Sequence, residues 1–454
     1  MTAKQLLLPG RKIANMMLKI ALPVALQQLV ITCLNMMDVL LVGGLGDNAI
    51  AGVALANQFE FLVSIFTFGV SSASMVLISQ YRGSGEYKKM RSVTAFSAAI
   101  LLVSTTLIAM VVAIFPEQLL RVFTSDQTLI DIGASYLRVV TPSYILISLS
   151  VVFSALMRCN ERASMPLMAS VVALVVNAGL SYCLIYGVAF FPNLGVVGSA
   201  CSLIVARLIE LCIILFFVYR GDKRQRVMSS DLRAVDRPMV KKYVKLSCPI
   251  VVNEVLWSIA IAGHSMIYGR MGMHVVAASS MAITLEQMFV VSFSGIANGG
   301  AIILSKELGA GRIRAAKKYA GIFSVWAVAV GLITCSMMFV LASPFLNTFF
   351  QQTSGAVRDL AATFIFVLAC YEPIRSYNFL NMTGILRSGG DAMFATIMET
   401  VCLYCVSLPL GFLLGVVWHM DPVIVITVIY LEEFLKAVVG FFRMRTFKWA
   451  KKLV

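Results

Sequence analysis

Charged residues are scarce in this sequence. They make up 13% of its 454 residues, against 59% hydrophobic residues, whereas a soluble domain is typically about 25% charged. Long polar stretches are equally rare, and apolar runs recur along the whole chain, which has a mean hydropathy of +0.89. These features exclude a soluble protein, and also a soluble domain with a single anchor. They predict a chain that crosses a lipid bilayer many times.

Motifs for ATP hydrolysis, catalysis and metal binding are also missing. The sequence contains no GxxxxGK[ST] phosphate loop and no polar segment long enough for an ATPase domain. Its three histidines do not make a metal site by themselves. The CxxC pair Cys402 and Cys405 lies in an apolar run, where ordinary helix packing explains it. We therefore expect neither an enzyme nor a bound cofactor or metal.

Positive charge is distributed unevenly along the chain. Lysine and arginine outnumber aspartate and glutamate by 37 to 22, which gives a formal net charge of +15. The basic residues gather before the first apolar run, after the last one and in alternate loops between them. Cytoplasmic loops of membrane proteins carry such an excess, so the charge indicates no nucleic-acid partner and places both termini in the cytoplasm. The alternation also requires an even number of helices.

Twelve segments are apolar enough to span a bilayer, which takes about 20 residues. They are 17–43, 51–80, 92–115, 130–157, 164–187, 197–219, 244–269, 275–305, 316–342, 357–386, 392–417 and 422–442. We predict an all-α membrane protein with a transmembrane helix at each of them. The basic polar linker 220–242 is predicted to divide the chain into an N-terminal six-helix lobe, 1–219, and a C-terminal six-helix lobe, 243–454.

An internal repeat relates the two halves. Shifting residues 21–85 by 226 positions places them on 247–311 without a gap. The informative matches are Pro23 with Pro249 and Glu60 with Glu286, because chance matches are least expected for proline and for an acid inside a membrane helix. Both copies begin on the cytoplasmic side, so the repeat is parallel, an arrangement known among secondary transporters.

Ionisable residues inside the apolar segments are candidates for function. A charged side chain at the centre of a membrane helix costs about 2.5–3.5 kcal/mol or more, so such residues are rare. The set comprises Asp38, Glu60, Arg207, Glu210, Glu254, Glu286, Glu372, Arg375, Glu399, Glu432, Glu433 and Lys436. Arg207 with Glu210, and Glu372 with Arg375, are three residues apart on one helix face, as Lys436 is from Glu433. Structural pairing on one helix is therefore the alternative to a functional role for these residues.

Asp38 and Glu254 have no basic residue within one helical turn. A low-dielectric environment disfavours the charged form of an unpaired carboxylate, so such a group can exchange a proton or bind a cation. A protonated carboxyl that bonds to a neighbouring helix is the alternative. Asn177 and Ser181 lie one helical turn apart and offer oxygen atoms of the kind that a hard cation prefers. An asparagine in a membrane helix also commonly joins two helices.

Several stretches of the sequence resemble one transporter family. KIALPVALQQLVITCLNMMDVLLVGGLGDNAIAGVALANQ and FGVSSASMVLISQYRGSGE, in the first half, are similar to the multidrug and toxic compound extrusion (MATE) transporters of bacteria. In the second half, SCPIVVNEVLWS, ELGAGRIRAAKKYA and GILRSGGDAMFA resemble the same family. The resemblance covers essentially the whole chain. It implies an antiporter in which an inward H⁺ or Na⁺ gradient drives export of organic cations through a cleft between two six-helix lobes.

The resemblance also implies roles for particular residues. Asp38 matches the family's cation-coupling aspartate of helix 1, and Asn177 matches the first asparagine of helix 5. The second asparagine of that pair is Ser181 here, and Ser202 stands in helix 6 where a threonine is common. A hydroxyl thus replaces an amide in the implied ion site, which weakens it as a Na⁺ site. Glu254 matches the carboxylate of helix 7.

One position departs from the family pattern in the C-terminal lobe. Some members carry an aspartate in helix 10, and counting back from Arg387 places Ser376 there in this chain. An ion site built from Glu254 and that aspartate is therefore not expected as such.

These observations lead to a prediction of an ion-coupled antiporter. Asp38, Asn177, Ser181 and Ser202 are expected to bind the coupling ion, H⁺ or Na⁺. The residues expected to serve the substrate, or an ion in the C-terminal lobe, are Glu60, Glu254, Glu286, Glu372 and Arg375. We expect a monomer in the inner membrane of a bacterium, with the lipid bilayer and a small organic cation as its partners.

Two other functions stay open from the sequence. A flippase for a lipid-linked saccharide or another amphipathic anion would use the membrane arginines Arg207 and Arg375. A channel without coupling would carry current without counter-transport, and both the repeat and the central carboxylates speak against it.

Overall fold

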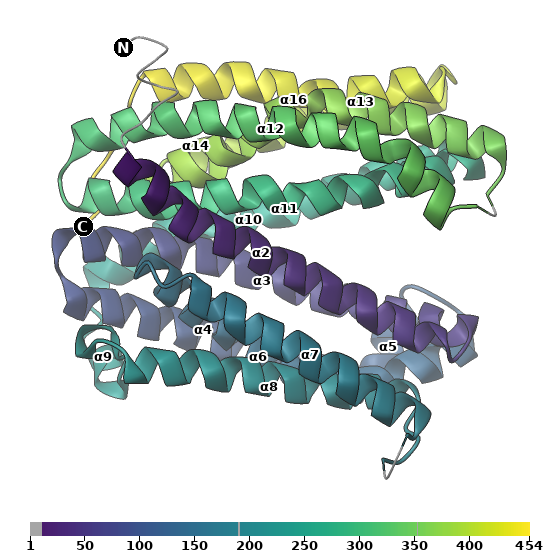
Figure 1. Ribbon diagram of the computed structural model, residues 1–454, viewed down its shortest axis with the longest axis horizontal. Coiled ribbons are helices and arrows are strands. Elements are labelled where there is room, and N and C mark those ends of the chain that lie inside the picture. Colours follow the sequence, from purple (N-terminus) through teal and green to yellow (C-terminus); the bar gives the residue numbers. More distant parts are fainter. Residues whose placement is uncertain (1–10, 189–190, 352) are drawn as a thin grey trace. The chain divides into compact units, whose positions relative to one another are not determined.

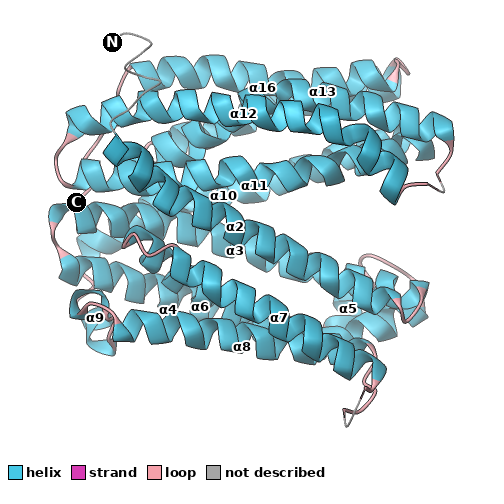
Figure 2. Ribbon diagram, viewed as in Figure 1, coloured by secondary structure: helices cyan, strands magenta, loops and turns pink. Residues whose placement is uncertain are grey.

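The protein is helical throughout the part of the chain that its structure, a computed structural model, describes. That part comprises residues 11–188, 191–351 and 353–454. Within these ranges there is no β-strand (Figure 2). The elements, labelled in Figure 1, are α2 (Arg11–Gly43), α3 (Asp47–Ser84), α4 (Tyr87–Ile114), α5 (Pro116–Leu120), α6 (Gln127–Cys159), α7 (Ser164–Tyr186), α8 (Val196–Arg220), η1 (Lys223–Gln225), α9 (Ser229–Arg233), α10 (Arg237–Met271), α11 (Met273–Gly309), α12 (Ile313–Phe349), α13 (Gly355–Phe379), η2 (Leu380–Leu386), η3 (Arg387–Gly389), α14 (Ala392–Val401), η4 (Cys402–Ser407), α15 (Leu408–Phe412), η5 (Leu413–Val417) and α16 (Pro422–Arg445).

Each of the apolar segments expected to span the membrane lies within these helices to within one residue. By length and composition alone, 10 helical spans of the described chain are suited to crossing a bilayer. The remaining two expected spans are α13 and α16, of 25 and 24 residues, which are long enough but carry charged residues in their interiors. The span 392–417 runs from α14 to η5 and includes short π-helical turns. The prolines expected inside helices, Pro23, Pro142, Pro249 and Pro373, all lie there.

The first helix of the second half begins earlier than its apolar segment. α10 starts at Arg237, although hydropathy alone places the start of the apolar run at residue 244. The added turns contain the exposed side chains of Lys241 and Lys242. Hydropathy locates the part of a helix that lies in lipid, whereas the backbone hydrogen bonds continue the same helix into the polar region. The linker that connects α8 to α10 therefore contains only η1 and the short α9.

The chain forms two compact units. The N-terminal unit is Leu26–Tyr243, and the C-terminal unit is Val244–Val454 together with the described residues up to Ala25. In the N-terminal unit, α6 packs against α3, α4 and α8, and α8 packs against α7 (Figure 1). In the C-terminal unit, α13 packs against α11, α12 and α16. Each unit has its own apolar core, which centres on Leu137 and Tyr144 in the first and on Phe364 and Leu368 in the second.

Small residues bring the beginning of α2 close to α11 within the C-terminal unit. A Cβ atom at Gly295 would lie 2.5 Å from the carbonyl oxygen of Ala21, and one at Gly299 would lie 3.1 Å from the sulfur of Met17. Small side chains allow this kind of close helix packing in membranes. In the N-terminal unit, Tyr243 is buried and its hydroxyl lies 3.0 Å from Oγ of Ser74.

The contact between α12 and α13 also depends on a glycine. A Cβ atom at Gly331 would lie 2.5 Å from Cα of Pro373 and 2.8 Å from the carbonyl oxygen of Glu372, so the backbones would have to separate. We expect Gly331→Ala to lower the free energy of unfolding by about 1–3 kcal/mol, measured by denaturation in detergent. Gly179→Ala in α7 is the control, because nothing lies within 4 Å of its Cβ position. Equal losses in both variants would contradict a packing role for Gly331.

Candidate functional site

Asp38 and Asn177 meet inside the N-terminal unit. Asp38 lies in the second half of α2 and is half-buried, whereas Asn177 lies in the middle of α7 and is fully buried. Nδ2 of Asn177 donates a hydrogen bond of 2.7 Å to Oδ1 of Asp38. The carbonyl oxygen of the same amide is buried and has no hydrogen-bond partner among the described residues. The pair therefore offers both carboxylate and amide oxygen atoms to a proton or a small cation.

Ser181 and Ser202 form a second pair in the same unit. Ser181 follows Asn177 by one turn of α7, and Ser202 lies on α8. Both are fully buried, their hydroxyl groups are hydrogen-bonded to each other, and Ser202 also donates to the carbonyl oxygen of Ser199 at 2.8 Å. Each hydroxyl oxygen keeps a lone pair outside these hydrogen bonds that is able to coordinate a cation.

Glu60 and Arg207 place further charges near Asp38. Glu60, on α3, is half-buried, and both it and Arg207, on α8, interact electrostatically with Asp38. The i,i+3 pair proposed on α8 is formed, because Nη1 of Arg207 lies 3.0 Å from Oε2 of Glu210 and both side chains are buried. The field of a charge at Asp38 therefore reaches charged groups on α3 and α8.

Sequence reasoning missed a hydrogen-bonded chain that continues from Glu210. Oγ of Ser170 donates to Oε1 of Glu210 at 2.6 Å, and Nε2 of Gln27 donates to Oγ of Ser170 at 3.0 Å. Nη2 of Arg158 in turn donates to Oε1 of Gln27 at 2.8 Å. Gln27 and Ser170 are neutral, so a search for membrane charges passes over them. The one sequence signal is that Gln27 is polar within an apolar run.

Glu254, in the C-terminal unit, has a cationic partner, which corrects the expectation that it is unpaired. Nη2 of Arg387 donates a hydrogen bond of 2.9 Å to Oε1 of Glu254. The two residues are 133 positions apart in the chain, so a search for partners within one helical turn does not find this pair. The neighbouring Asn253 donates to Oε2 of Glu399 at 2.7 Å, which places a second carboxylate beside the pair.

The charged residues of α11, α13 and α16 form one cluster around Arg375. Its guanidinium is ion-paired with Glu286, lies 3.4 Å from Glu372 and 3.9 Å from Glu433, and stacks over the ring of Tyr430 at 5.5 Å. The i,i+3 pair of Glu372 and Arg375 is thus formed, but within a larger cluster. Glu286 and Glu372 are buried.

Lys436 extends the cluster along α16. Its Nζ lies 3.0 Å from Glu432 and 2.8 Å from Glu433, and all three side chains are largely buried. Asn378 donates to Oε2 of Glu433 at 2.7 Å. Ser376, where the resemblance led us to look for an aspartate, donates its hydroxyl to the carbonyl oxygen of Ala327 at 2.7 Å. The acids of this cluster are therefore held on α11, α13 and α16.

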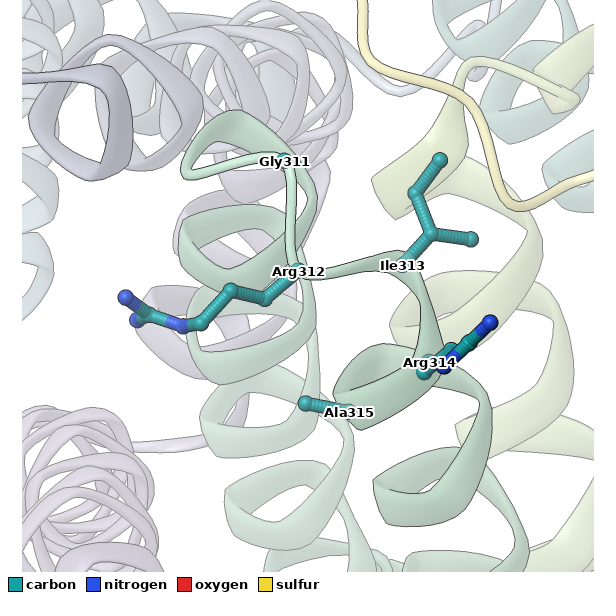
Figure 3. Close-up of a pocket in the computed structure, with 5 residues that line it drawn as sticks. All are labelled: Gly311, Arg312, Ile313, Arg314 and Ala315. Atoms are coloured by element: carbon teal, nitrogen blue, oxygen red, sulfur yellow. The ribbon is translucent and has the colours of Figure 1, made fainter.

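Among the described residues, no three histidine, cysteine, aspartate or glutamate side chains are grouped so as to hold a metal ion. A pocket of about 510 Å³ lies at the turn between α11 and α12 and is lined by Gly311, Arg312, Ile313, Arg314 and Ala315. The side chains of Arg312 and Arg314 point away from each other (Figure 3). None of the five lining residues is acidic, and Arg312 is ion-paired with Glu307, which precedes the turn.

The sequence matches the MatE family over residues 23–183 and 249–413, and these two ranges begin at the prolines that the internal repeat relates. YisQ of Bacillus subtilis, named an uncharacterized transporter, is 22% identical over 417 residues, which cover 91% of this chain and 90% of YisQ. NorM of Rhizobium meliloti, named a probable multidrug resistance protein, is 25% identical over 403 residues, which cover 85% of each chain.

Solved structures share the fold. The MATE transporter VcmN of Vibrio cholerae in its bent form matches with a TM-score of 0.87 and 16% identity, over 96% of this chain and 97% of VcmN. The predicted fold class, an all-α membrane protein with twelve transmembrane helices in two lobes, is thereby confirmed. The chain belongs to the MatE family, and it is a membrane transporter and not an enzyme.

Proposed function

We propose that this transporter is an antiporter that exports organic cations in exchange for H⁺ or Na⁺. The observation that carries the proposal is the hydrogen bond of 2.7 Å that Asn177 donates to Asp38. This bond stabilises a carboxylate inside membrane helices. Among the described residues, that carboxylate has no ion-pair partner. The names of relatives such as NorM, a probable multidrug resistance protein, support an efflux role. The acidic character of the buried clusters favours cations as substrates.

Binding of the coupling ion at Asp38 follows from the groups around it. A bound proton or Na⁺ neutralises the carboxylate. Neutralisation is favourable because the low dielectric of the membrane disfavours the charged form. The oxygen of Asn177 has no hydrogen-bond partner among the described residues, and we propose that it binds Na⁺ or, after the amide turns over, accepts a hydrogen bond from a protonated Asp38. Ser181 and Ser202 supply hydroxyl oxygens through the lone pairs that their hydrogen bonds leave free. Substrate and ion then compete for the same negative charge.

The acids outside this site are proposed to serve the substrate. Glu60 adds a second carboxylate near Asp38, and Glu286 with Glu372 adds two in the C-terminal unit. Arg375 and Arg387 neutralise part of this charge. Glu254 is paired with Arg387, so that ion pair must break before Glu254 can contact a cation.

We further propose that the chain has six-helix lobes at 1–219 and 243–454, joined by a linker at 220–242. We also propose that the protein is a monomer in the inner membrane of a bacterium.

Efflux from proteoliposomes tests the function. The full-length protein is reconstituted, a fluorescent organic cation is enclosed, and a pH gradient or a Na⁺ gradient is imposed in separate experiments. We expect efflux to follow one of the two gradients, and the effective gradient names the ion. Efflux under neither gradient would contradict the antiport proposal. Gradient-independent movement of a lipid-linked saccharide across the same vesicles would instead support the flippase alternative, with Arg207 and Arg375 as the next residues to change.

A further inference from the structure

The internal repeat also covers the helices that carry the partners of Asp38 and Gln27. The two ranges that match the MatE family begin 226 positions apart and end 230 positions apart. Between these limits, Arg158 at the end of α6 and Arg387 in η3 are 229 positions apart, and an alanine lies five residues after each. The second copy is thus four residues longer than the first, and the last of these residues is added after position 392.

A π-helical turn accounts for this last added residue. η4, Cys402–Ser407, continues the span that begins with α14. A π-helical hydrogen bond spans five residues instead of four, so its turn contains one residue more than an α-helical turn, and such turns are frequent at functional sites. The offset between the copies is therefore 229 before η4 and 230 at its end. These offsets relate Ser170 to Glu399 and Asn177 to Ser407.

One hydrogen bond occurs at the same place in both units. In the N-terminal unit, Gln27 of α2 donates to Ser170 of α7 at 3.0 Å. The offsets of 226 and 229 relate these two residues to Asn253 of α10 and Glu399 of α14. Nδ2 of Asn253 donates to Oε2 of Glu399 at 2.7 Å. The two units thus join the related helices by the same contact, made with different side chains.

The Asp38 site also has a counterpart in the C-terminal unit. The offsets of 226 and 230 relate Asp38 and Asn177 to His264 of α10 and Ser407 of η4. Nε2 of His264 lies 2.9 Å from Oγ of Ser407, as Nδ2 of Asn177 lies 2.7 Å from Oδ1 of Asp38. Both His264 and Ser407 are buried. In each unit, a titratable side chain therefore meets an uncharged partner at the related place.

Ser407 fixes the direction of its hydrogen bond with His264. Its hydroxyl donates to the carbonyl oxygen of Ile429, on α16, at 2.9 Å, so its single hydrogen is used. The oxygen of Ser407 then accepts from His264, which places the hydrogen of the neutral imidazole on Nε2. An imidazole of this form takes up a proton at Nδ1, and both forms keep the bond to Ser407.

The charge that faces His264 comes from α16. Lys436 interacts electrostatically with His264, and its Nζ lies 3.0 Å from Glu432 and 2.8 Å from Glu433. Oε2 of Glu432 is buried and has no hydrogen-bond partner among the described residues. Two acids and one base thus leave one negative charge in excess, which a proton on His264 balances.

The other elements that pack against α10 around His264 contribute no charge. α15 and η5, which contact Gly263 and Ile267, contain no titratable residue. The cysteines and the tyrosine of η4 have ordinary pKa values of about 8.5 and about 10, so these groups are mainly uncharged at neutral pH. They are Cys402, Tyr404 and Cys405.

We propose that His264 and Ser407 form a proton-binding site in the C-terminal unit, at the place that the repeat relates to the Asp38 site. A proton removes a negative charge at Asp38 and adds a positive charge at His264, so each unit becomes more positive by one charge. Hard cations such as Na⁺ prefer oxygen ligands to imidazole, so the site is selective for the proton. A positive charge at His264 opposes binding of an organic cation in the same unit. This last step rests on the proposed antiport.

Nuclear magnetic resonance of the full-length protein in nanodiscs, with ¹⁵N-labelled histidine, tests the inference. The chain has three histidines, and His274 and His419 are exposed, so His264→Gln identifies the signal of the buried one. We expect the neutral ring of His264 to carry its hydrogen on Nε2. We also expect Nδ1 to gain a proton as the pH is lowered from about 8 to about 4. A ring that stays neutral over this range, or a neutral ring with its hydrogen on Nδ1, would overturn the inference.

Ser407→Ala tests the role of the serine. Loss of one buried hydrogen bond should lower the ratio of the Nε2–H form to the Nδ1–H form of neutral His264 about fivefold. Ser265→Ala is the matched control, because Ser265 follows His264 in α10, is exposed and bonds to the carbonyl oxygen of Ile261. It should leave the ratio within about twofold. Equal ratios in the two variants would contradict the pairing with Ser407. The spectra of the native protein decide the question if Ser407→Ala does not fold.

Transport separates this inference from the antiport proposal. In proteoliposomes, His264→Gln is expected to lower the order of pH-driven efflux in proton concentration by about one, because one proton fewer is bound. His274→Gln, at the exposed start of α11, should leave the order unchanged. An unchanged order in His264→Gln would remove this proton from the transport cycle. Absence of gradient-driven efflux in the unmodified protein contradicts the antiport proposal alone, because the histidine spectra do not depend on efflux.

Discussion

Replacing Asp38 by asparagine is expected to abolish gradient-driven efflux while leaving the protein folded. The amide keeps the size of the side chain and retains a hydrogen bond to Asn177, but it neither takes up a proton nor balances the charge of Na⁺. Groups that transfer protons in a catalytic step typically contribute a hundredfold or more to its rate. We therefore expect the rate of efflux under the effective gradient to fall by at least about a hundredfold, measured in proteoliposomes with equal amounts of folded protein.

Asp47→Asn is the matched control for this prediction. Asp47 is the first residue of α3, close to Asp38 in sequence but exposed. Its replacement removes the same charge from the exposed end of a membrane helix and should leave the rate within about twofold, as for other surface substitutions. Normal efflux by Asp38→Asn would remove Asp38 from the mechanism, and Glu60 would become the next carboxylate to test.

Replacing Arg375 by methionine is expected to cause the largest loss of stability. Arg375 is the cation that Glu286, Glu372 and Glu433 share, and Lys436 is the other cation of the same cluster. Removing one partner of a buried ion pair leaves an uncompensated charge and typically costs about 3–5 kcal/mol. We expect a loss of this size in the free energy of unfolding, measured by denaturation in detergent micelles.

Two further variants show whether the loss comes from the cluster. Arg358→Met removes an arginine from the same helix, α13. The hydrogen bond of 3.4 Å between Arg358 and Asn347 lies at an exposed position. The variant should therefore change the free energy of unfolding by no more than about 0.5 kcal/mol. Combining Arg375→Met with Glu286→Gln removes both partners and should recover part of the loss. A double variant as unstable as the sum of its two single variants would mean that the pair is not coupled.

Much of the fold follows from composition and periodicity. The scarcity of charge and the recurrence of apolar runs predicted the twelve membrane segments, because the bilayer requires each span to satisfy its own backbone hydrogen bonds. The ends of helices were less predictable. α10 begins at Arg237, ahead of its apolar run, because polar residues outside the lipid continue the helix.

Part of the candidate site was also predictable. The spacing of Arg207 and Glu210 predicts their pairing on one helix face, and the structure forms that pair at 3.0 Å. Asp38 and Asn177 were brought into one site by resemblance to a family, since no periodicity relates residues 139 positions apart. That they bind the coupling ion stays a prediction until efflux is measured.

The sequence by itself determined which residues are in the membrane, which of them carry charge and which halves repeat, because hydropathy, charge and spacing are properties of the chain. Only the tertiary structure determined which buried polar side chains form ion pairs and hydrogen bonds with each other. It paired Glu254 with Arg387, merged the acids of α11, α13 and α16 around Arg375, and joined Gln27 to Ser170. Such partners come from different helices, and in a membrane the geometry of helix packing selects which buried polar groups come within hydrogen-bonding distance.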